Sequence, residues 1–275
     1  MRLEGKVAVI TGGGGGLGRE MGRLFAGEGA SVVLGDISDE GLEQTATLIR
    51  SDGGIADSRQ CDVSNEGDVE ALVAAALSRH GRLDVMCNNA GIPTPGFGSI
   101  EVHEITREQW ERQLQVNLSG VFYGIKHASR AMIASGGGSI INTSSASAHI
   151  VYPGWAIYAA AKAGVVGLTR GAAVDLGKYG IRVNAMTPLS GMSAAFLKGS
   201  QVSGSYEEQA GWDPGKTAIP LKLGRPPGLA DHARLALFLA SDESVYISGQ
   251  AISLDGAQMA RVGTQPAPVA ADAPV

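Results

Sequence analysis

The sequence predicts an α/β fold: a single doubly wound, Rossmann-type domain with a mainly parallel, seven-stranded sheet and helices on both faces. Two observations predict it. Short apolar runs alternate with segments of helical periodicity, which is typical of parallel sheets. The chain also contains 40 glycines among 275 residues, about twice the average usage of roughly 7%. These glycines lie between apolar runs, most densely at residues 12–18, and glycine at strand-to-helix turns is typical of nucleotide-binding sheets.

The first two strand–helix pairs follow each other without a long connection. The aliphatic run KVAVIT at residues 6–11 predicts a strand, and apolar residues at helical spacing predict a helix over 18–28. SVVLGD at residues 31–36 repeats the strand pattern, and residues 39–50 repeat the helical one. Together they predict the start of a parallel sheet.

The middle of the chain continues the alternation. Residues 56–62 predict a third strand, although few of them are apolar, and residues 66–80 show apolar residues at helical spacing. LDVMCN at residues 83–88 predicts the fourth strand. One long helix is expected after it, over residues 108–135.

The last part supplies three further strands. They are expected at residues 139–144 (SIINTS), 181–188 (IRVNAMTP) and 250–254, with helices over 156–179 and 230–240 between them. Because strand–helix–strand crossovers are right-handed, this order of elements predicts a doubly wound sheet.

The chain shows no composition break that would divide it before its end. We therefore expect one domain over residues 1–261. Within it, residues 189–223 form a long segment without a regular pattern, which predicts a substrate-binding loop or lid. Residues 262–275 (VGTQPAPVAADAPV) form a Pro/Ala-rich tail that is either a disordered end or a cap over a neighbouring subunit's pocket.

Composition excludes several classes of protein. The chain carries 22 basic and 27 acidic residues, a net charge of −5, which argues against a nucleic-acid or anionic-membrane partner. No apolar run approaches the roughly 18 to 20 residues of a membrane span, and the N-terminus lacks a secretory pattern. We therefore expect a cytoplasmic protein. Cys61 and Cys87 have no metal-ligand spacing, so neither a metal site nor a disulfide is expected.

A glycine-rich run connects the first strand to the first helix. Thr11 is followed by five glycines, Leu17 and Gly18; the absence of side chains lets a pyrophosphate approach the N–H groups of the helix N-terminus. Asp36 ends the second strand, where a carboxylate accepts the ribose hydroxyls of an adenosine and repels a 2′-phosphate. No Lys or Arg lies at residues 11–17 or 35–40. The pattern predicts NAD rather than NADP.

A second group of residues predicts acid–base chemistry. Tyr158 and Lys162 are four residues apart and share one face of the expected helix. A nearby cation favours the phenolate and lowers a pKa that is about 10 in isolation, which makes a tyrosine usable as a general acid or base. Ser145, at the end of the fifth strand, could hold a substrate oxygen together with the phenol.

Further short motifs accompany these two groups. They are CDV at 61–63, NNAG at 88–91, VNL at 116–118, SGQ at 248–250 and LDG at 254–256. With the glycine run and the Tyr-x-x-x-Lys pair, they make the sequence resemble the short-chain dehydrogenase/reductase family over residues 3–260. The resemblance implies the strand order 3-2-1-4-5-6-7.

The resemblance also implies roles for individual residues. Tyr158 would exchange the proton, Ser145 would polarise the substrate oxygen, Lys162 would hold the nicotinamide ribose, and Asn117 would position a water that links Lys162 to solvent. Asp62 would contact the adenine. The residues implied in cofactor binding are Gly12, Gly14, Gly16, Leu17, Gly18, Asp36, Ile37, Asp62, Val63, Asn89, Ala90, Gly91, Tyr158, Lys162, Pro188, Gly191 and Ser193.

The sequence departs from the family's pattern in one place. After the sixth strand the family has Pro-Gly, but this chain has Pro188-Leu189, and Ser193 stands where the family has a threonine that touches the nicotinamide carboxamide. Ser193 keeps the hydroxyl, whereas Leu189 would reshape the rim of the pocket. Ser144 competes with Ser145 for the role of catalytic serine, and the spacing favours Ser145.

These observations predict an NAD-dependent dehydrogenase or reductase acting on a secondary alcohol or ketone. One alternative is an NADPH-dependent 3-ketoacyl-type reductase of fatty-acid or polyketide synthesis, which would place a basic residue near the glycine run. Another is a nucleotide-binding regulator without turnover, which would lack Tyr158 or Lys162.

The size of the substrate and the assembly of the protein can also be anticipated. Large apolar residues around the expected catalytic centre predict a pocket for an apolar or cyclic substrate: Tyr152, Trp155, Met192, Phe196, Leu197, Tyr206 and Trp212. The resemblance implies a homotetramer. The many alanines and glycines of residues 159–167 agree with close helix–helix contact.

Overall fold

The computed structural model describes residues 1–189, 215, 219–225 and 227–260. Its centre is a seven-stranded sheet in the order β3-β2-β1-β4-β5-β6-β7, and every neighbouring pair is parallel. This confirms the predicted fold class and strand order. The strands are β1 (Val7–Thr11), β2 (Ser31–Asp36), β3 (Ile55–Gln60), β4 (Val85–Asn88), β5 (Gly138–Thr143), β6 (Ile181–Pro188) and β7 (Ala251–Leu254).

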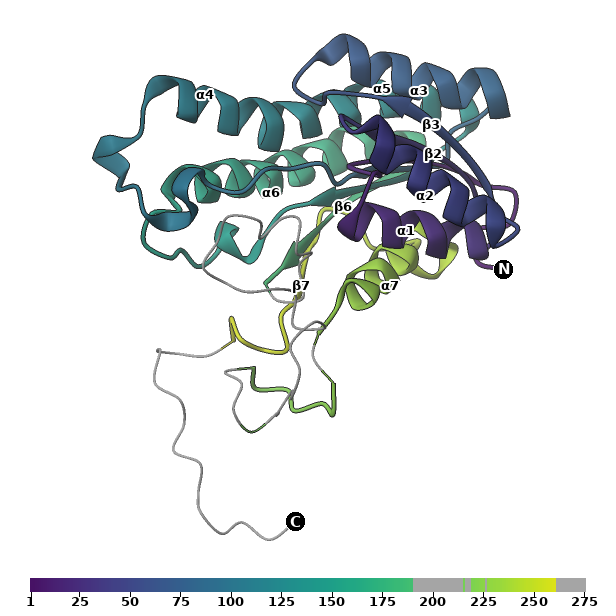
Figure 1. The fold of residues 1–275 in the computed structure, drawn as a ribbon. Helices are drawn as coiled ribbons and strands as arrows, with labels where there is room; N and C mark the ends of the chain where they lie inside the picture. The colour runs from purple at the N-terminus through teal and green to yellow at the C-terminus, as the bar shows by residue number, and fades with distance from the viewer. Residues whose placement is uncertain (190–214, 216–218, 226, 261–275) are drawn as a thin grey trace, which may run out of the picture.

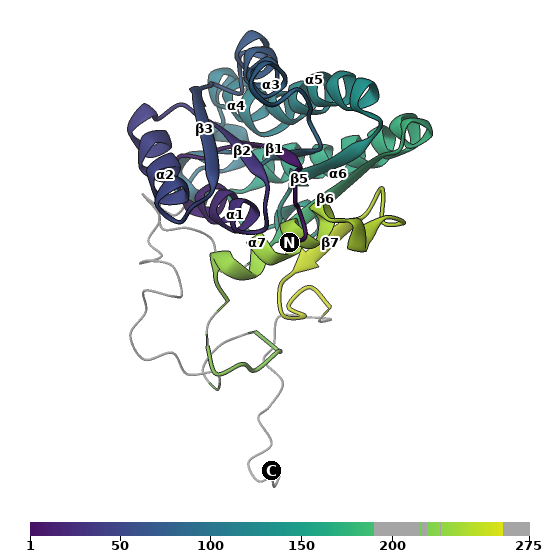
Figure 2. The ribbon, with the colours of Figure 1, turned by 90° about the vertical axis from the view of Figure 1, so that its right-hand side faces the viewer.

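Seven α-helices of the described residues cover the two faces of the sheet, as Figures 1 and 2 show. One face carries α1 (Gly16–Gly27), α2 (Asp39–Ser51) and α7 (Leu229–Ala240), and the other carries α3 (Glu66–His80), α4 (Arg107–Leu114), α5 (Gly120–Ser135) and α6 (Ala156–Leu176). Short 3₁₀ helices span Pro95–Gly98, Val102–Glu104, Ala146–Ala148, Gly177–Tyr179 and Asp242–Ser244.

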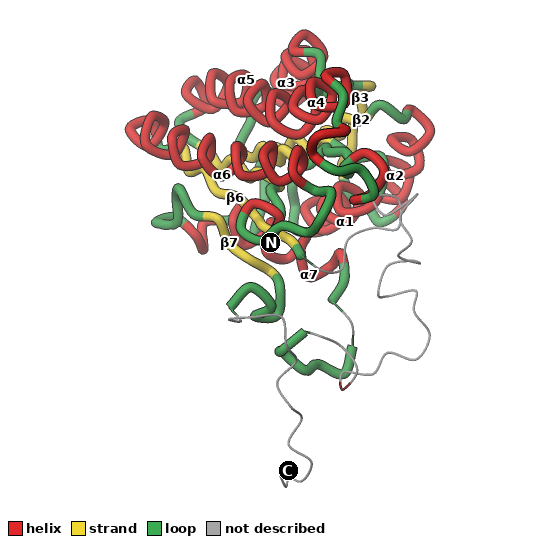
Figure 3. Tube along the Cα trace, turned by 90° about the vertical axis from the view of Figure 1, so that its left-hand side faces the viewer, coloured by secondary structure: helices red, strands yellow, loops and turns green. Residues whose placement is uncertain are grey.

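The two hydrophobic cores follow from the alternation of side chains along each strand. In β1, Ala8 and Ile10 pack in the core beneath α1, α2 and α7, whereas Val7 and Val9 pack in the core beneath α3, α5 and α6. Both faces of a parallel sheet are buried, so its strands read as continuous apolar runs rather than alternating ones. Figure 3 shows the strands enclosed between the helices.

The long helix expected over 108–135 is interrupted. The structure has α4, then a π-helical turn at Gln115–Ser119, then α5. A single π-helical turn inserts an extra residue into the helical register, and such turns are frequent at functional sites. Here the turn carries Asn117, which is fully buried. Periodicity alone could not locate this interruption, because the apolar pattern continues through it.

No helix in the described part of the chain is both long and apolar enough to cross a membrane. Most of the segment 189–223 lies outside the described residues, and so does the whole of the tail at 262–275. The proposals made for them therefore stay predictions.

Candidate active site

The predicted functional residues gather where β1, β2, β4 and β5 end. In a doubly wound sheet, ligands bind at the carboxyl ends of the strands, where the chain reverses its direction of winding. The loops after β1 and β4 are tied together there. The Thr11 hydroxyl accepts hydrogen bonds from the backbone N–H groups of Asn89 (3.0 Å) and Ala90 (3.1 Å), and the Asn89 side chain donates to the Thr11 carbonyl at 3.1 Å.

The glycine loop has the shape that a pyrophosphate requires. Gly12 adopts a φ of +69°, and a Cβ there would lie 3.0 Å from Ala90 Cα. A Cβ on Gly18 would lie 2.0 Å from the Gly12 carbonyl oxygen, so the first turn of α1 packs directly on the loop. Helix α1 has no side-chain cap at its N-cap Gly15 and no acidic residue in its first turn. Its backbone N–H groups therefore lie where an anionic group can reach them, and the loop fits a dinucleotide.

Asp36 lies beside this loop. One carboxylate oxygen accepts a hydrogen bond from Gly14 N–H at 3.0 Å, and the other accepts one from Ser38 N–H, also at 3.0 Å. The remaining lone pairs can accept hydroxyl groups. Ile37, the next residue, is largely exposed. The Asp36 carboxylate is therefore able to accept hydrogen bonds from the hydroxyl groups of a ligand.

Asp62 and Val63 follow the last residue of β3 by two and three positions. Asp62 accepts hydrogen bonds from Ser64 N–H (2.9 Å) and Ser64 Oγ (2.7 Å). The hydrogen bond from the Ser64 hydroxyl holds the pKa of Asp62 below its usual value. Val63 is buried and packs against Gly120.

Tyr158 and Lys162 project from one face of α6 and are both buried. The Tyr158 hydroxyl is hydrogen-bonded to Ser145. Lys162 Nζ lies 5.7 Å from the centroid of the Tyr158 ring and donates to the Thr143 carbonyl at 2.9 Å. The structure thus brings together three groups that the sequence separates by up to 17 positions.

The pKa of Tyr158 is not lowered as the sequence led us to expect from its neighbour Lys162. Burial raises the pKa of Tyr158 above its usual range, and the hydrogen bond from Ser145 only partly opposes this shift. Burial lowers the pKa of Lys162 to about 8. The reason is that the site is almost closed to water, so loss of hydration acts more strongly on both groups than the lysine charge acts on the phenol.

The two candidate serines have different partners. Ser144 is buried, and its hydroxyl donates to the Lys162 carbonyl at 2.8 Å, which ties α6 to the end of β5. Ser145 is the one that meets the Tyr158 hydroxyl. This geometry supports Ser145 for contact with substrate and gives Ser144 a structural part.

Asn117 and Gly91 meet next to Lys162. The Asn117 amide donates to the Ile92 carbonyl at 2.9 Å and accepts from Ile92 N–H at 3.0 Å. A Cβ on Gly91 would lie 2.7 Å from Asn117 Oδ1 and 3.5 Å from Lys162 Nζ. The Asn117 side chain therefore anchors the loop after β4 beside the lysine.

Trp155 lies beside Tyr158. Its ring meets the Tyr158 ring edge to face, with centroids 5.3 Å apart and planes at 90°. A Cβ on Gly98 would lie 2.8 Å from the indole nitrogen, so the loop after β4 also packs against the Trp155 ring. Val151 and Tyr152, which precede Trp155 by four and three residues, are each more than half exposed.

The structure describes only the beginning of the region after β6, where further cofactor- and substrate-binding residues are predicted. Pro188 is the last residue of β6, is buried and pairs with Leu254. The remaining predicted residues of this region lie outside the described residues: Gly191, Met192, Ser193, Phe196, Leu197, Tyr206 and Trp212.

Two groups that hold parts of the site in place were not predicted from the sequence. Arg19 reaches back from α1 to the carbonyl oxygen of Gly14 at 2.7 Å. A search for basic residues that extended one helical turn past the glycine loop would have found it. The Thr143 carbonyl, which holds Lys162, left no signal in the sequence, because it is a backbone group whose position depends on the fold.

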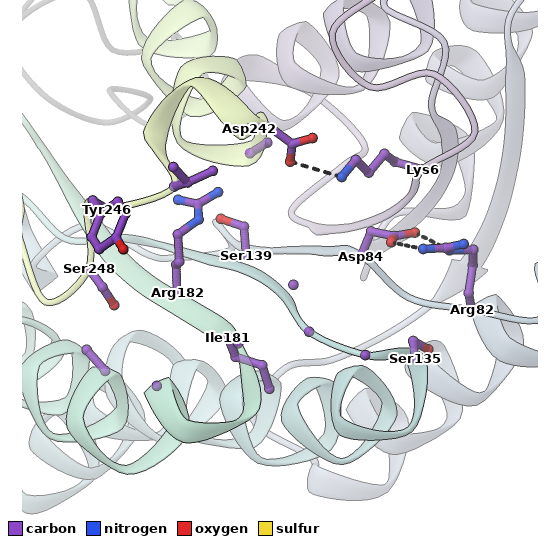
Figure 4. A pocket seen from close by; sticks show the side chains of 18 residues that line it. Lys6, Arg82, Asp84, Ser135, Ser139, Ile181, Arg182, Asp242, Tyr246 and Ser248 are labelled. Carbon is purple, nitrogen blue, oxygen red and sulfur yellow. Dashed lines mark hydrogen bonds and ion pairs between the residues drawn. The ribbon is translucent and has the colours of Figure 1, made fainter.

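A separate pocket of about 490 Å³ opens at the opposite, amino-terminal edge of the sheet (Figure 4). Its charged side chains are paired or hydrogen-bonded: Lys6 with Asp242 at 3.1 Å, Arg82 with Asp84 at 2.6 Å, and Arg182 with the Leu239 and Ser241 carbonyls. These pairings stabilise the fold, and none of the predicted catalytic residues lines this pocket.

Comparison with known proteins places these features in context. A family profile described as enoyl-(acyl carrier protein) reductase matches residues 13–257. A momilactone A synthase from Oryza sativa subsp. japonica is 42% identical over 256 residues, which cover 93% of this chain and 90% of the relative. A mitochondrial borneol dehydrogenase from Lavandula x intermedia is 42% identical over 259 residues, covering 93% and 91% of the two chains. The crystal structure of a levodione reductase superimposes with a TM-score of 0.85 at 34% identity, covering 95% of this chain and all of the other.

Proposed function

The chain belongs to the short-chain dehydrogenase/reductase family of oxidoreductases, which transfer hydride between a nicotinamide cofactor and an alcohol or ketone, and we propose that this member uses NAD and acts on an apolar, cyclic substrate. The observation that carries the chemistry is the hydrogen bond between Tyr158 and Ser145, with Lys162 beside it, next to the glycine loop. This arrangement offers a proton-transfer group and a hydrogen-bond donor to one substrate oxygen.

The residues divide the work as follows. The substrate oxygen lies between Ser145 and the Tyr158 oxygen, which as the phenolate accepts the hydroxyl proton in alcohol oxidation and as the phenol donates a proton in ketone reduction. Lys162, held by the Thr143 carbonyl, offsets with its positive charge part of the loss of hydration that keeps Tyr158 protonated, and binds the nicotinamide ribose. Asn117 holds the loop after β4 beside Lys162 and positions the water that exchanges its proton with solvent. The bound nicotinamide cofactor accepts or supplies the hydride.

Asp36 supports the choice of NAD. Its carboxylate lies one hydrogen bond from Gly14 in the loop, where it accepts ribose hydroxyls and opposes a 2′-phosphate by charge repulsion. Ile37 and the pair Asp62–Val63 flank the adenine. Gly12, Gly16, Leu17 and Gly18 hold the pyrophosphate; Asn89, Ala90, Gly91, Pro188, Gly191 and Ser193 line the nicotinamide end.

The apolar substrate is supported by the surroundings of the tyrosine. Trp155 contacts the Tyr158 ring, and Val151 and Tyr152, which lie between Ser145 and Trp155 in the sequence, are more than half exposed. The names of two relatives refer to borneol and levodione. We infer a substrate without charge whose carbonyl carbon belongs to a ring.

One assay tests both parts of the proposal. Reduction of NAD and of NADP is followed separately with a panel of cyclic, aromatic and steroidal secondary alcohols that includes borneol, with open-chain alcohols of matched carbon number as controls. We expect NADH formation with at least one cyclic alcohol. A preference for NADP, or for the open-chain alcohols throughout, would contradict the corresponding part.

A carrier-dependent NADPH reductase is the second candidate. Two observations favour it: the matching family profile is that of an enoyl-(acyl carrier protein) reductase, and the Arg19 guanidinium lies beside the glycine loop. Faster NADPH oxidation with a 3-ketoacyl thioester than with any cyclic ketone would establish it. A regulator without turnover is disfavoured, because Tyr158, Lys162, Ser145 and Asn117 are all present and adjacent.

We further propose a homotetramer that works in the cytoplasm without a nucleic-acid or membrane partner, folded as one domain over residues 1–261 with a substrate lid at 189–223 and a C-terminal tail at 262–275. Exposed apolar side chains on the outer side of the sheet's second helical layer support the assembly: Trp110, Phe122, Ile133 and Val174.

A further inference from the structure

The segment before α6 and the loop after β4 meet at two glycines. Gly154 adopts a φ of +73° and Gly98 a φ of +88°, the left-handed region of backbone conformation that favours glycine. A Cβ on Gly154 would lie 2.2 Å from the Gly98 carbonyl oxygen and 2.4 Å from Gly98 Cα. The buried Thr94, from the same loop as Gly98, donates its hydroxyl to the Gly154 carbonyl at 3.2 Å. The two segments therefore touch through their backbones and leave no room for a side chain at Gly154.

This backbone contact also determines what the Trp155 side chain packs against. A Cβ on Gly98 would lie 2.8 Å from the Trp155 indole nitrogen and 2.9 Å from the Pro153 carbonyl oxygen. The Trp155 ring in turn meets the Tyr158 ring edge to face, with centroids 5.3 Å apart. One indole thus contacts both Gly98 and Tyr158, so a displacement of the loop at Gly98 is transmitted to the tyrosine through a single side chain.

Tyr158 lies in a turn of α6 that needs support from outside its own helix. It is the third residue of α6, and the N-cap residue is Trp155, whose indole can donate a hydrogen bond but cannot accept one from the first N–H groups. Helix ends that lack an accepting cap are less stable. One turn further along, the Ser144 hydroxyl fastens the Lys162 carbonyl to the end of β5. For the first turn, the packing of Trp155 on Gly98 supplies such an attachment.

We propose that Gly98 and Gly154 are positioning residues of the active site. Their contact seats the Trp155 indole on the Tyr158 ring and so keeps the Tyr158 hydroxyl beside Ser145, where the substrate oxygen binds. The inference rests on the proposed role of Tyr158 in proton transfer. It gives the loop after β4 a part in catalysis in addition to its proposed part in cofactor binding.

Gly154→Ala tests the contact directly. The added methyl carbon would have to withdraw by about 1 Å from the Gly98 carbonyl oxygen to reach a normal contact distance. Because a displacement of about 1 Å in an active site can lower the rate about 100-fold, we expect kcat to fall by about 10- to 100-fold. The NADH dissociation constant, measured by calorimetry without substrate, should stay the same.

Gly81→Ala is the matched control for this substitution. Gly81 has almost the same φ, +76°, but a Cβ there would have nothing within 4 Å. The control therefore carries the cost of a left-handed alanine without the collision, and its kcat should equal that of the wild type. Equal kcat in folded Gly154→Ala and Gly81→Ala proteins would overturn the proposal.

The seating of the Trp155 indole is followed independently of catalysis by fluorescence. The chain has three tryptophans, so Trp110→Phe and Trp212→Phe together leave Trp155 as the sole emitting indole. In that background Gly154→Ala should shift the emission to longer wavelength and increase quenching by acrylamide, because the indole loses part of its packing. Gly81→Ala should change neither property. An unaltered spectrum in the Gly154→Ala protein would contradict the proposed seating.

Thr94→Val is a milder variant that keeps the proposal testable if Gly154→Ala does not fold. Valine has nearly the shape of threonine but cannot donate to the Gly154 carbonyl. We expect kcat to fall by about three- to tenfold, the contribution of one hydrogen bond, with unchanged NADH binding. Thr47→Val, on the exposed side of α2, is the control. Wild-type kcat and Trp155 emission in Thr94→Val would count against the contact.

The outcomes separate this inference from the proposed function. If Tyr158→Phe keeps a normal kcat, the assignment of the proton-transfer group fails, whereas the Trp155 spectrum still reports on the contact of the two glycines. If Tyr158→Phe is inactive but Gly154→Ala and Thr94→Val keep a normal kcat, only the positioning role fails. Thermal melting of every variant identifies loss of fold. A purely structural role would lower Tm and leave kcat, measured well below Tm, unchanged.

Discussion

Tyr158 and Lys162 are both almost fully buried, and burial acts on their protonation in opposite directions. It raises the pKa of the phenol and lowers that of the ammonium to about 8. Each group is thereby pushed toward its neutral form. Tyr158 therefore keeps its proton at neutral pH, and a substrate oxygen between Ser145 and Tyr158 meets a phenol. A positive charge next to Tyr158 would have to offset the loss of hydration before the phenolate could form.

Tyr158→Phe tests the proton-transfer group at this scale. The substitution keeps the ring and its contact with Trp155 but removes the hydroxyl, so kcat should fall by about 10²- to 10⁴-fold, the usual contribution of general acid–base catalysis. NADH binding should persist. Steady-state kinetics and a binding titration measure the two effects, and near-normal kcat would contradict the assignment.

The lowered pKa of Lys162 has a consequence for stability. Between pH 8 and the ordinary value of 10.5, the unfolded chain binds a proton at this lysine that the folded protein does not. The free energy of unfolding of the wild type should therefore rise across this window relative to Lys162→Met, with a slope of up to about 1.4 kcal/mol per pH unit. Below pH 8 both states are protonated and the difference is constant.

Urea unfolding of both proteins from pH 7 to pH 10.5 measures this slope. Lys178→Met, which removes an exposed lysine at the end of the helical segment after α6, is the control and should show no such dependence. Parallel curves for wild type and Lys162→Met would show that Lys162 titrates in the folded protein as it does in the unfolded chain.

At the scale of elements, the site depends on contacts between segments that are distant in sequence. Helix α6 is fastened to β5 by the Ser144 hydroxyl and, deeper, by a chain of buried amides. Asn88 donates to Asn142 at 2.9 Å and Asn142 donates to Thr169 at 2.9 Å. Buried hydrogen bonds of this kind rigidify the elements that they join. Tyr158 and Lys162 therefore keep their positions relative to Ser145.

Gly91→Ala tests the junction between the loop after β4 and the π-helical turn. The added methyl group would lie 2.7 Å from Asn117 Oδ1, which cannot retreat easily because Ile92 holds the amide at both ends. We expect kcat to fall at least tenfold, about 1.4 kcal/mol in activation free energy, with an unchanged circular dichroism spectrum.

Gly27→Ala is the matched control for this substitution, because a Cβ at Gly27 would have nothing within 4 Å. It should leave kcat unchanged. If Gly91→Ala has the activity of Gly27→Ala, the close approach of this loop to Asn117 and Lys162 has no part in catalysis.

Trp155→Ala tests the wall of the pocket. Removal of the indole takes away an apolar surface beside Tyr158, so KM for cyclic alcohols should rise about tenfold, the free energy of burying a small apolar side chain, and that for open-chain alcohols should rise less. Trp110→Phe, on α4, serves as the control. Equal losses for both substrate classes would argue that Trp155 only packs the N-terminus of α6.

At the scale of the whole molecule, the sheet and its two helical layers leave an apolar outer surface. Phe122 and Ile133 on α5 and Val174 on α6 are exposed, Val174 to 82%. Isolated exposed apolar side chains are common on proteins. These ones, however, lie on α6, which carries Tyr158 and Lys162, and on α5, which follows the π-helical turn with Asn117. A symmetric contact between copies through this layer would cover them.

Light scattering tests the assembly. The wild type should have a mass close to four times 28.2 kDa, and Phe122→Asp should lower it, because the substitution places a charge in the proposed contact. Leu48→Asp, on the exposed side of α2, should leave the mass unchanged. A wild-type mass near 28.2 kDa would contradict the tetramer.

The sequence by itself determined the fold class and the segments that meet at the site, and its resemblance to a known family implied the order of the strands. Hydrophobic periodicity and motif spacing are local properties, so runs such as residues 6–11 and 31–36 predicted strands that the structure confirms. Only the tertiary structure decided how the residues act on one another. The reach of Arg19 to Gly14, the partner of each serine, the π-helical turn at Asn117 and the opposite pKa shifts of Tyr158 and Lys162 all depend on burial and on contacts between distant backbone groups. No local pattern encodes these quantities, because loss of hydration and hydrogen-bond pairing are set by every element packed around a group.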